Sequence, residues 1–227
     1  MRVSLLMLTY NRLEYTKMSL ENLFKNTNYP YDLWIIDNKN IKDNTREYLV
    51  DLKKREPKIT RLILNDTNEG LSKSTNRFWK ETNTEIVGKI DNDTLVPEGW
   101  LTKLVEALDK VSQLMMVSGI HFENWELVYN HPVPCKMFND IKLYLPTHTG
   151  GCCYILKRTA INKIGYLNEE CGCLYGWTRY QEVMRQEGMM LAYHNDVRVE
   201  LLGGETHSPK SLDNTPKYQE YNKEVRG

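Results

Sequence analysis

The chain has 227 residues, 41% hydrophobic and 26% charged, so it can bury a substantial core and has the composition of a globular protein. Thirty basic and thirty acidic side chains balance, which removes any general electrostatic argument for a nucleic-acid or anionic-membrane partner. Five cysteines without a C-x-x-C pair argue against a disulfide framework and against a sulfur-ligated metal. The apolar stretch at residues 3–8 is too short for a signal sequence or a membrane span, and we therefore expect a cytoplasmic protein.

Apolar runs of strand length alternate with helical patterns in the first half of the chain. The runs stop at polar residues, and the helical stretches repeat apolar residues three and four apart. Four such alternations predict an α/β fold with a mainly parallel sheet, right-handed crossovers and helices on both faces. The expected strands are residues 3–8, 33–36, 59–64 and 86–90, and the expected helices are residues 13–24, 43–54, 71–81 and one with Pro97 in its first turn.

The pattern changes after residue 114. A strand is expected at residues 115–120, followed by a long stretch with few helical signals. This half is therefore predicted to be a smaller, mixed region. Its other expected elements are a strand at 152–156, a short helix at 157–164, a helix at 177–186 and late strands at 189–193 and 197–202.

Residues 91–93, Asp-Asn-Asp, directly follow the fourth expected strand. Two close carboxylates repel, so the motif favours a divalent cation; a plain polar turn is the alternative, because Asp and Asn are ordinary turn residues. Thr9, Asp37 and the polar turn at 65–70 follow the other strands, and in a parallel sheet all these positions fall on the edge where ligands bind. A polar turn could explain each of these positions separately, but it would not explain why four polar segments fall on the same edge of the sheet.

Glycine signatures narrow the chemistry at that edge. No G-x-G-x-x-G follows the first strand and no G-x-x-x-x-G-K-[ST] occurs, so neither a dehydrogenase nor a P-loop nucleotide hydrolase is supported. A divalent metal on Asp93, with Asp91 on a sugar hydroxyl or on the same ion, would neutralise a diphosphate and stabilise it as a leaving group. The sequence therefore predicts Mn²⁺ or Mg²⁺ as cofactor.

Several motifs stand in an order typical of one enzyme family. They are Thr9-Tyr10-Asn11-Arg12, Asp37-Asn38, Asn68-Glu69-Gly70 with Asn76, Asp91-Asn92-Asp93, Pro97-Glu98-Gly99-Trp100-Leu101, Gly150-Gly151 before a strand ending in Lys157-Arg158, and Ile164-Gly165-Tyr166-Leu167-Asn168-Glu169. By these motifs the chain resembles family 2 glycosyltransferases from residue 3 to about residue 207. The resemblance implies the Rossmann-like GT-A fold, with a donor half at 1–112 and an acceptor half at 113–208 of one domain, and a tail at 209–227.

The resemblance also implies roles for individual residues. Asp37 would accept a hydrogen bond from a uracil ring. The residues implied for the donor nucleotide are Thr9, Tyr10, Asn11, Arg12, Asp37, Asn68, Gly70, Lys73, Asp91 and Asn92; those for the metal are Asp93, Asp91 and His207; those for the acceptor or sugar are Gly150, Gly151 and Trp177. A surface histidine and a core tryptophan are the alternative interpretations of His207 and Trp177.

The catalytic base is where the chain departs from the family pattern. Members of the family carry Glu-Asp after a Gly-Trp or Gly-Gly pair, with the Asp as base, whereas here the Gly-Trp pair is followed by Thr178-Arg179. Arginine cannot accept a proton at neutral pH. Glu170, Glu169 and Glu182 are the expected replacements in an inverting reaction, and Glu170 is favoured because Glu169 stands where the family's acid fixes a loop. A retaining route without a base is the alternative.

We therefore expect a glycosyltransferase that moves a sugar from a nucleotide-diphosphate donor, a UDP-sugar, to a hydroxyl acceptor in polysaccharide or glycoconjugate synthesis. A non-catalytic nucleotide-sugar binder is the alternative from another class, motivated by Arg179 at the position of the base. A nucleotidyltransferase shares the alternating sheet and the metal-bound carboxylates. It would carry a glycine- and lysine-rich first loop, and residues 9–12 do not form one.

Overall fold

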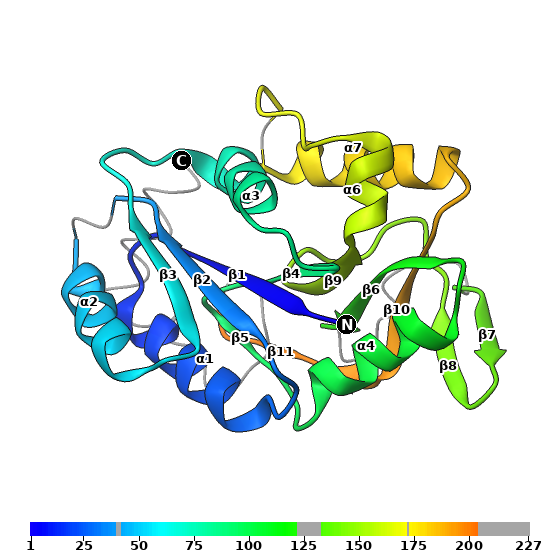
Figure 1. Cartoon of the computed structure of the whole chain (residues 1–227), viewed down its shortest axis with the longest axis horizontal. Helices are drawn as coiled ribbons and strands as arrows, with labels where there is room; N and C mark the ends of the chain where they lie inside the picture. The colour runs from blue at the N-terminus through cyan, green and yellow to red at the C-terminus, as the bar shows by residue number, and fades with distance from the viewer. Residues whose placement is uncertain (40–41, 122–132, 172, 204–227) are drawn as a thin grey trace.

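The computed structural model describes residues 1–39, 42–121, 133–171 and 173–203 (Figure 1). Its elements, in chain order, are β1 (Val3–Thr9), α1 (Leu13–Asn26), β2 (Asp32–Asp37), α2 (Thr45–Arg55), β3 (Ile59–Leu64), α3 (Gly70–Glu81), β4 (Ile86–Ile90), β5 (Thr94–Leu95), α4 (Trp100–Lys110), β6 (Leu114–Ile120), β7 (Cys135–Phe138), β8 (Ile141–Tyr144), β9 (Cys153–Lys157), α6 (Arg158–Ile164), α7 (Cys173–Gln186), β10 (Met190–Arg198) and β11 (Glu200–Leu201).

Within the described residues, one large sheet has the strand order β3-β2-β1-β4-β9-β6-β10-β8-β7, and β11 pairs with β5 in a small second sheet. The predicted parallel half is confirmed, because β3, β2, β1 and β4 all run in parallel. β9 runs antiparallel between β4 and β6, so these two strands point the same way and end at the same edge. Figure 1 shows α3, α6 and α7 on one side of the sheet and α1 and α4 on the other, which is the predicted α/β layering.

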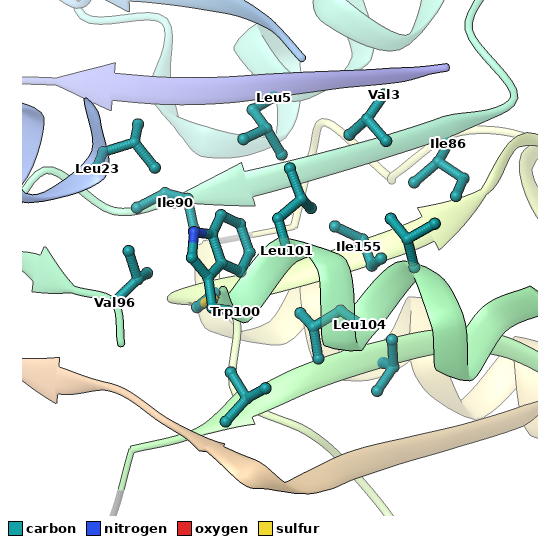
Figure 2. Packing of buried hydrophobic residues seen from close by; sticks show 14 of the residues in the cluster. Val3, Leu5, Leu23, Ile86, Ile90, Val96, Trp100, Leu101, Leu104 and Ile155 are labelled. Atoms are coloured by element: carbon teal, nitrogen blue, oxygen red, sulfur yellow. The ribbon is translucent and has the colours of Figure 1, made fainter. Parts of the chain in front are cut away.

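The central strand β1 is buried on both faces because helices cover both sides of the sheet. Leu5 packs with Trp100 and Leu101 of α4 on one face (Figure 2), while Leu6 joins the cluster containing Phe78 of α3 on the other. Strands buried on both faces carry continuous apolar runs without alternation. This explains why residues 3–8 are almost wholly apolar.

Gly88 allows β4 and β9 to pack closely. A Cβ atom built at this position would lie 2.6 Å from the Tyr154 carbonyl oxygen and 2.8 Å from Leu5 Cδ2. We expect Gly88→Ala to lower the free energy of unfolding by about 1–3 kcal/mol, because the nearest atom is backbone and cannot turn away. Urea unfolding would measure the change. Gly119→Ala is the control and should cost less stability, since the nearest atom there belongs to the Val199 side chain, which can move. A Gly88→Ala variant as stable as wild type would contradict this account of the packing.

Three predicted elements differ from the structure by more than two residues. Helix α4 begins at Trp100, because Gly99 adopts a left-handed conformation (φ 67°) that starts the helix after Pro97. Helix α7 begins at Cys173, four residues before the expected start. The two late strands are mostly one strand, β10. The polar pair after His194 does not break this strand but forms an irregularity in its pairing with β6.

Among the described residues, we find no helix long and apolar enough to span a bilayer.

Candidate functional site

The carboxyl edge of the large sheet brings together most of the residues predicted for ligand binding. Backbone hydrogen bonds continue past the strand ends: the Asn38 N–H donates to the Thr9 carbonyl oxygen (2.8 Å), and the Asn65 N–H donates to that of Asp37 (2.9 Å). The Asp91 N–H donates to the Cys152 carbonyl oxygen at 2.8 Å, which joins β4 to the loop before β9. The predicted clustering on one edge is therefore present in the structure.

Asp37 lies at the end of β2 with a fully buried side chain. Its Oδ1 accepts a hydrogen bond from Thr9 Oγ1 (2.9 Å), and its Oδ2 is 3.1 Å from Nε of Arg46 on α2, which forms an ion pair. The carboxylate thus ties the ends of β1 and β2 to α2. Contact between Asp37 and a uracil ring stays a prediction, and it requires the ring to reach a group that is covered here.

A second polar network lies beside Asp37. Asn38 Oδ1 accepts hydrogen bonds from Asn65 Nδ2 (2.9 Å) and from Ser74 Oγ on α3 (3.2 Å), and Asn38 Nδ2 donates to the Gly70 carbonyl oxygen (3.4 Å). Asn68 Oδ1 accepts from the Gly70 N–H at 2.9 Å, which closes the turn into α3. The predicted residues Asn68 and Gly70 therefore shape this turn, while the predicted Lys73 is exposed and pairs with Glu69 at 3.0 Å.

The turn between β1 and α1 carries the predicted residues Tyr10, Asn11 and Arg12. Asn11 and Arg12 both adopt left-handed backbone conformations (φ 55° and 67°), which reverse the chain at the sheet edge. Asn11 is buried, and its Oδ1 accepts a hydrogen bond from the Lys42 N–H at 3.3 Å, while Tyr10 is half-buried. This turn directs Arg12 toward the turn that follows β4.

Asp91 and Asp93 are each paired with a cation. Asp91 forms an ion pair with Lys89 of β4, and Asp93 Oδ2 lies 2.9 Å from Arg12 Nη1. Burial and the Asp91 charge raise the pKa of Asp93, whereas the Arg12 and Lys89 charges lower it. Between the two carboxylates, the Asn92 amide donates to Thr16 Oγ1 of α1 at 2.9 Å and anchors the turn. The two carboxylates therefore share one electrostatic environment.

This carboxylate pair suits a hard divalent cation, which binds oxygen ligands. Within the described ranges, no cluster of three or more His, Cys, Asp or Glu side chains could hold a metal. The predicted ligand His207 lies outside the described residues. Gly203, four positions earlier, packs against the site: a Cβ atom there would be 2.6 Å from both Asp93 Oδ2 and Arg12 Nη2.

Gly150 and Gly151 lie in the loop before β9, in tight contact with aromatic rings. A Cβ atom on Gly150 would be 2.3 Å from the His121 ring, and the Gly150 N–H donates to Tyr193 Oη at 2.5 Å. A Cβ atom on Gly151 would be 3.2 Å from Nε1 of Trp177. The Trp177 ring is only 9% exposed and stacks on Tyr154 with centroids 4.4 Å apart, so it forms part of the core and presents an edge to this loop.

The three candidate bases differ in what holds their carboxylates. Glu169 Oε1 accepts a hydrogen bond from Asn76 Nδ2 at 2.8 Å, and Asn76 also donates to the Leu167 carbonyl oxygen, so this carboxylate fixes the loop. Glu182 pairs with Arg179 at 2.8 Å on the surface of α7. Glu170 is exposed, and its backbone N–H donates to the Asn168 side chain at 2.9 Å.

Sequence reasoning missed three residues near the site. Lys89 was missed although a lysine inside the apolar run of β4 is itself a signal. His121 follows β6 at the same edge as Asp91; burial lowers its pKa to about 4 against the opposing Asp91 charge, so the imidazole is neutral at neutral pH. Gln181 of α7 is buried and binds both the N–H (2.7 Å) and the carbonyl oxygen (3.1 Å) of Thr149. No local sequence signal predicts that long-range pair.

Comparison with known proteins decides the family. The family model described as "Glycosyl transferase family 2" matches residues 4–165. The chain belongs to glycosyltransferase family 2. Among curated proteins, it is 23% identical over 190 residues to the uncharacterized glycosyltransferase YwdF of Bacillus subtilis (strain 168), an alignment that covers 79% of this chain and 67% of YwdF.

Solved glycosyltransferase structures share the fold of this family 2 chain. A mannosyltransferase from Pyrobaculum calidifontis, in complex with GDP-Man and Mn²⁺, superposes with a TM-score of 0.73 at 17% identity, covering 90% of this chain and 58% of that one. GalNAc-T7 with UDP, GalNAc and Mn²⁺ gives 0.73 at 15% identity, covering 98% of this chain and 47% of that one. S. aureus TarS 1–349 with UDP-GlcNAc gives 0.65 at 17% identity, covering 90% and 60%. The chain thus spans about half to three fifths of these solved chains.

Proposed function

We propose that this chain transfers a sugar from a UDP-sugar to a hydroxyl acceptor, with inversion and with the help of a divalent cation, in polysaccharide or glycoconjugate synthesis. The observation that carries the proposal is the carboxylate pair Asp91 and Asp93 at the carboxyl edge of the sheet of a family 2 chain. The fold-related mannosyltransferase structure contains GDP-Man and Mn²⁺ and the GalNAc-T7 structure contains UDP and Mn²⁺, which supports a nucleotide-sugar donor and a divalent cation here.

In this proposal Asp93 and Asp91 hold the cation, with His207 as a further ligand. This role is compatible with the chain, because the backbone of Gly203 packs against Asp93 and Arg12 and four residues can span up to roughly 14 Å. When bound, the cation would neutralise the diphosphate leaving group. The protein side chains would orient the donor: Thr9, Asn11, Asp37 and the Asn68–Gly70 turn at the nucleoside, and the Gly150–Gly151 loop at the sugar.

We expect UDP binding to depend on a divalent ion, because Lys89 and Arg12 are already paired with Asp91 and Asp93 and leave the diphosphate without a cation of its own. Isothermal titration calorimetry with UDP in Mn²⁺ and in excess EDTA tests this. Titration with GDP in place of UDP tests selectivity for the nucleobase. Asp93→Asn keeps the shape of the side chain but removes its charge, and tests whether the metal effect depends on Asp93. Equal UDP affinity in Mn²⁺ and in EDTA would contradict the metal role.

The second candidate, a non-catalytic nucleotide-sugar binder, rests on Arg179. Its guanidinium is exposed and paired with Glu182, so the position of the family's base holds no proton acceptor. Release of UDP from a UDP-sugar by the intact protein in Mn²⁺ separates the two functions. Tight binding without release across a panel of UDP-sugars and acceptors would favour the binder.

A further inference from the structure

The Arg12 guanidinium stands at Asp93, one of the two proposed metal ligands. Nη1 lies 2.9 Å from Asp93 Oδ2, and the two side chains are only 12% and 17% exposed. Exposed ion pairs contribute little to stability, whereas a pair shielded from solvent is screened far less. A metal ion at Asp93 would therefore compete with a strong internal partner.

Contacts with α1 and with the backbone after β11 hold Arg12 in this position. Its backbone is left-handed (φ 67°), and its carbonyl oxygen accepts the Thr16 N–H (3.0 Å) at the start of α1. Its guanidinium lies 4.9 Å from the centre of the Tyr15 ring. A Cβ atom on Gly203 would be 2.6 Å from Nη2 and 2.7 Å from Nη1, so the backbone after β11 also packs against the guanidinium. The contact is built into the fold, unlike a chance surface pair.

The other cation at the site is placed differently. Lys89, which pairs with Asp91, lies on β4, inside the sheet between β1 and β9, with its side chain 3% exposed. Arg12 lies in the turn before α1, outside the strands of the sheet, and its side chain is 12% exposed. Of the two cations, Arg12 is the one that can exchange its partner without disturbing the sheet.

We infer that Arg12 is an internal counter-ion that competes with the metal for Asp93, so that the cation binds strongly only together with a nucleoside diphosphate. The guanidinium pairs with the Asp93 carboxylate, and a metal held by Asp93 would compete for the same carboxylate. A diphosphate offers the displaced guanidinium a replacement anion, since arginine pairs well with phosphate oxygens. Because such coupling is reciprocal, the nucleotide also gains affinity from the metal. The inference rests on the proposed function, which brings metal and diphosphate to this edge.

Electron paramagnetic resonance of free Mn²⁺ measures this competition without any turnover. Mn²⁺ is titrated into wild type, Arg12→Met and Arg61→Met, each with and without UDP. Arg61→Met removes the same charge from an exposed pair with Glu81 (3.7 Å) and serves as the control. We expect Arg12→Met to bind Mn²⁺ alone roughly tenfold to hundredfold more tightly than wild type, the usual value of a charged hydrogen bond, and the enhancement by UDP to shrink. Unchanged or weaker Mn²⁺ binding by Arg12→Met would overturn the inference.

A measurement on wild-type protein covers the case in which Arg12→Met does not fold. In protein labelled with ¹⁵N-arginine, the Arg12 Nε resonance, assigned with Arg12→Lys, should shift when Mg²⁺ and UDP are added together and stay in place with Mg²⁺ alone. A full shift with Mg²⁺ alone also overturns the inference. Absence of any joint binding of metal and UDP by wild type would instead refute the proposed function, so the two failures are distinguishable.

Discussion

Glu170→Gln slows sugar transfer by about 10²–10⁴-fold if Glu170 removes the proton from the acceptor hydroxyl, the usual contribution of a placed general base. The amide keeps the shape of the side chain and loses its basicity. Of the three carboxylates, Glu169 is bound by Asn76 and Glu182 is paired with Arg179, and the choice of Glu170 stays a prediction. Glu170 extends from the exposed loop between the loop-fixing Glu169 and α7.

Single-turnover transfer by Glu170→Gln, Glu169→Gln and Glu182→Gln tests the assignment, with the anomeric configuration of the product read by NMR. Glu182→Gln tests the third candidate, whose carboxylate pairs with Arg179 at 2.8 Å and lies 3.8 Å from His148 Nε2. Glu169→Gln should mainly reduce stability, because it weakens the hydrogen bond from Asn76. Near-normal rates for all three variants, together with retained configuration, would replace the inverting mechanism by a retaining one.

Asp37→Asn is expected to lower the free energy of unfolding by about 3 kcal/mol, because it leaves Arg46 without its buried counter-ion. It should also weaken UDP binding roughly tenfold to hundredfold, the value of one charged hydrogen bond, while Mn²⁺ affinity stays nearly unchanged. Urea unfolding measures the first effect, and calorimetry well below the unfolding transition measures the second.

Glu81→Gln is the matched control for Asp37, since it removes a carboxylate from an exposed pair with Arg77 at 2.9 Å. Its effect on stability should stay below about 1 kcal/mol. Wild-type affinity for UDP in folded Asp37→Asn would remove Asp37 from the donor site and leave it a structural role alone.

The alternation of apolar runs and helical patterns was enough to predict the parallel half of the sheet, because each run is local and buried on both faces. The position of β9 was not predictable in the same way. The strand at residues 152–156 was predicted, but no local sequence feature indicates that this strand lies antiparallel between β4 and β6. The need for glycine at position 88 becomes clear only when Tyr154 is known to lie beside it.

In the candidate site, too, local sequence predicts some residues, while others are brought in only by the fold. Asp91 and Asp93 were predictable because their carboxylates follow an apolar run at a fixed spacing. Their partners were not: Arg12 lies more than eighty positions from Asp93, and the match depends on two left-handed residues in the preceding turn. Gly203 belongs to the site through close approach of its backbone, which has no signature in a single sequence.

The insertion of β9 between β4 and β6 also constrains how the chain is made. During synthesis, residues up to about 150 emerge before β9, so one edge of β4 stays without the strand that pairs with it in the folded protein. Unpaired strand edges invite association with other chains. The nascent chain therefore passes through an interval of exposure that ends only when residues 153–157 arrive, and a fragment that stops before them would keep that open edge permanently.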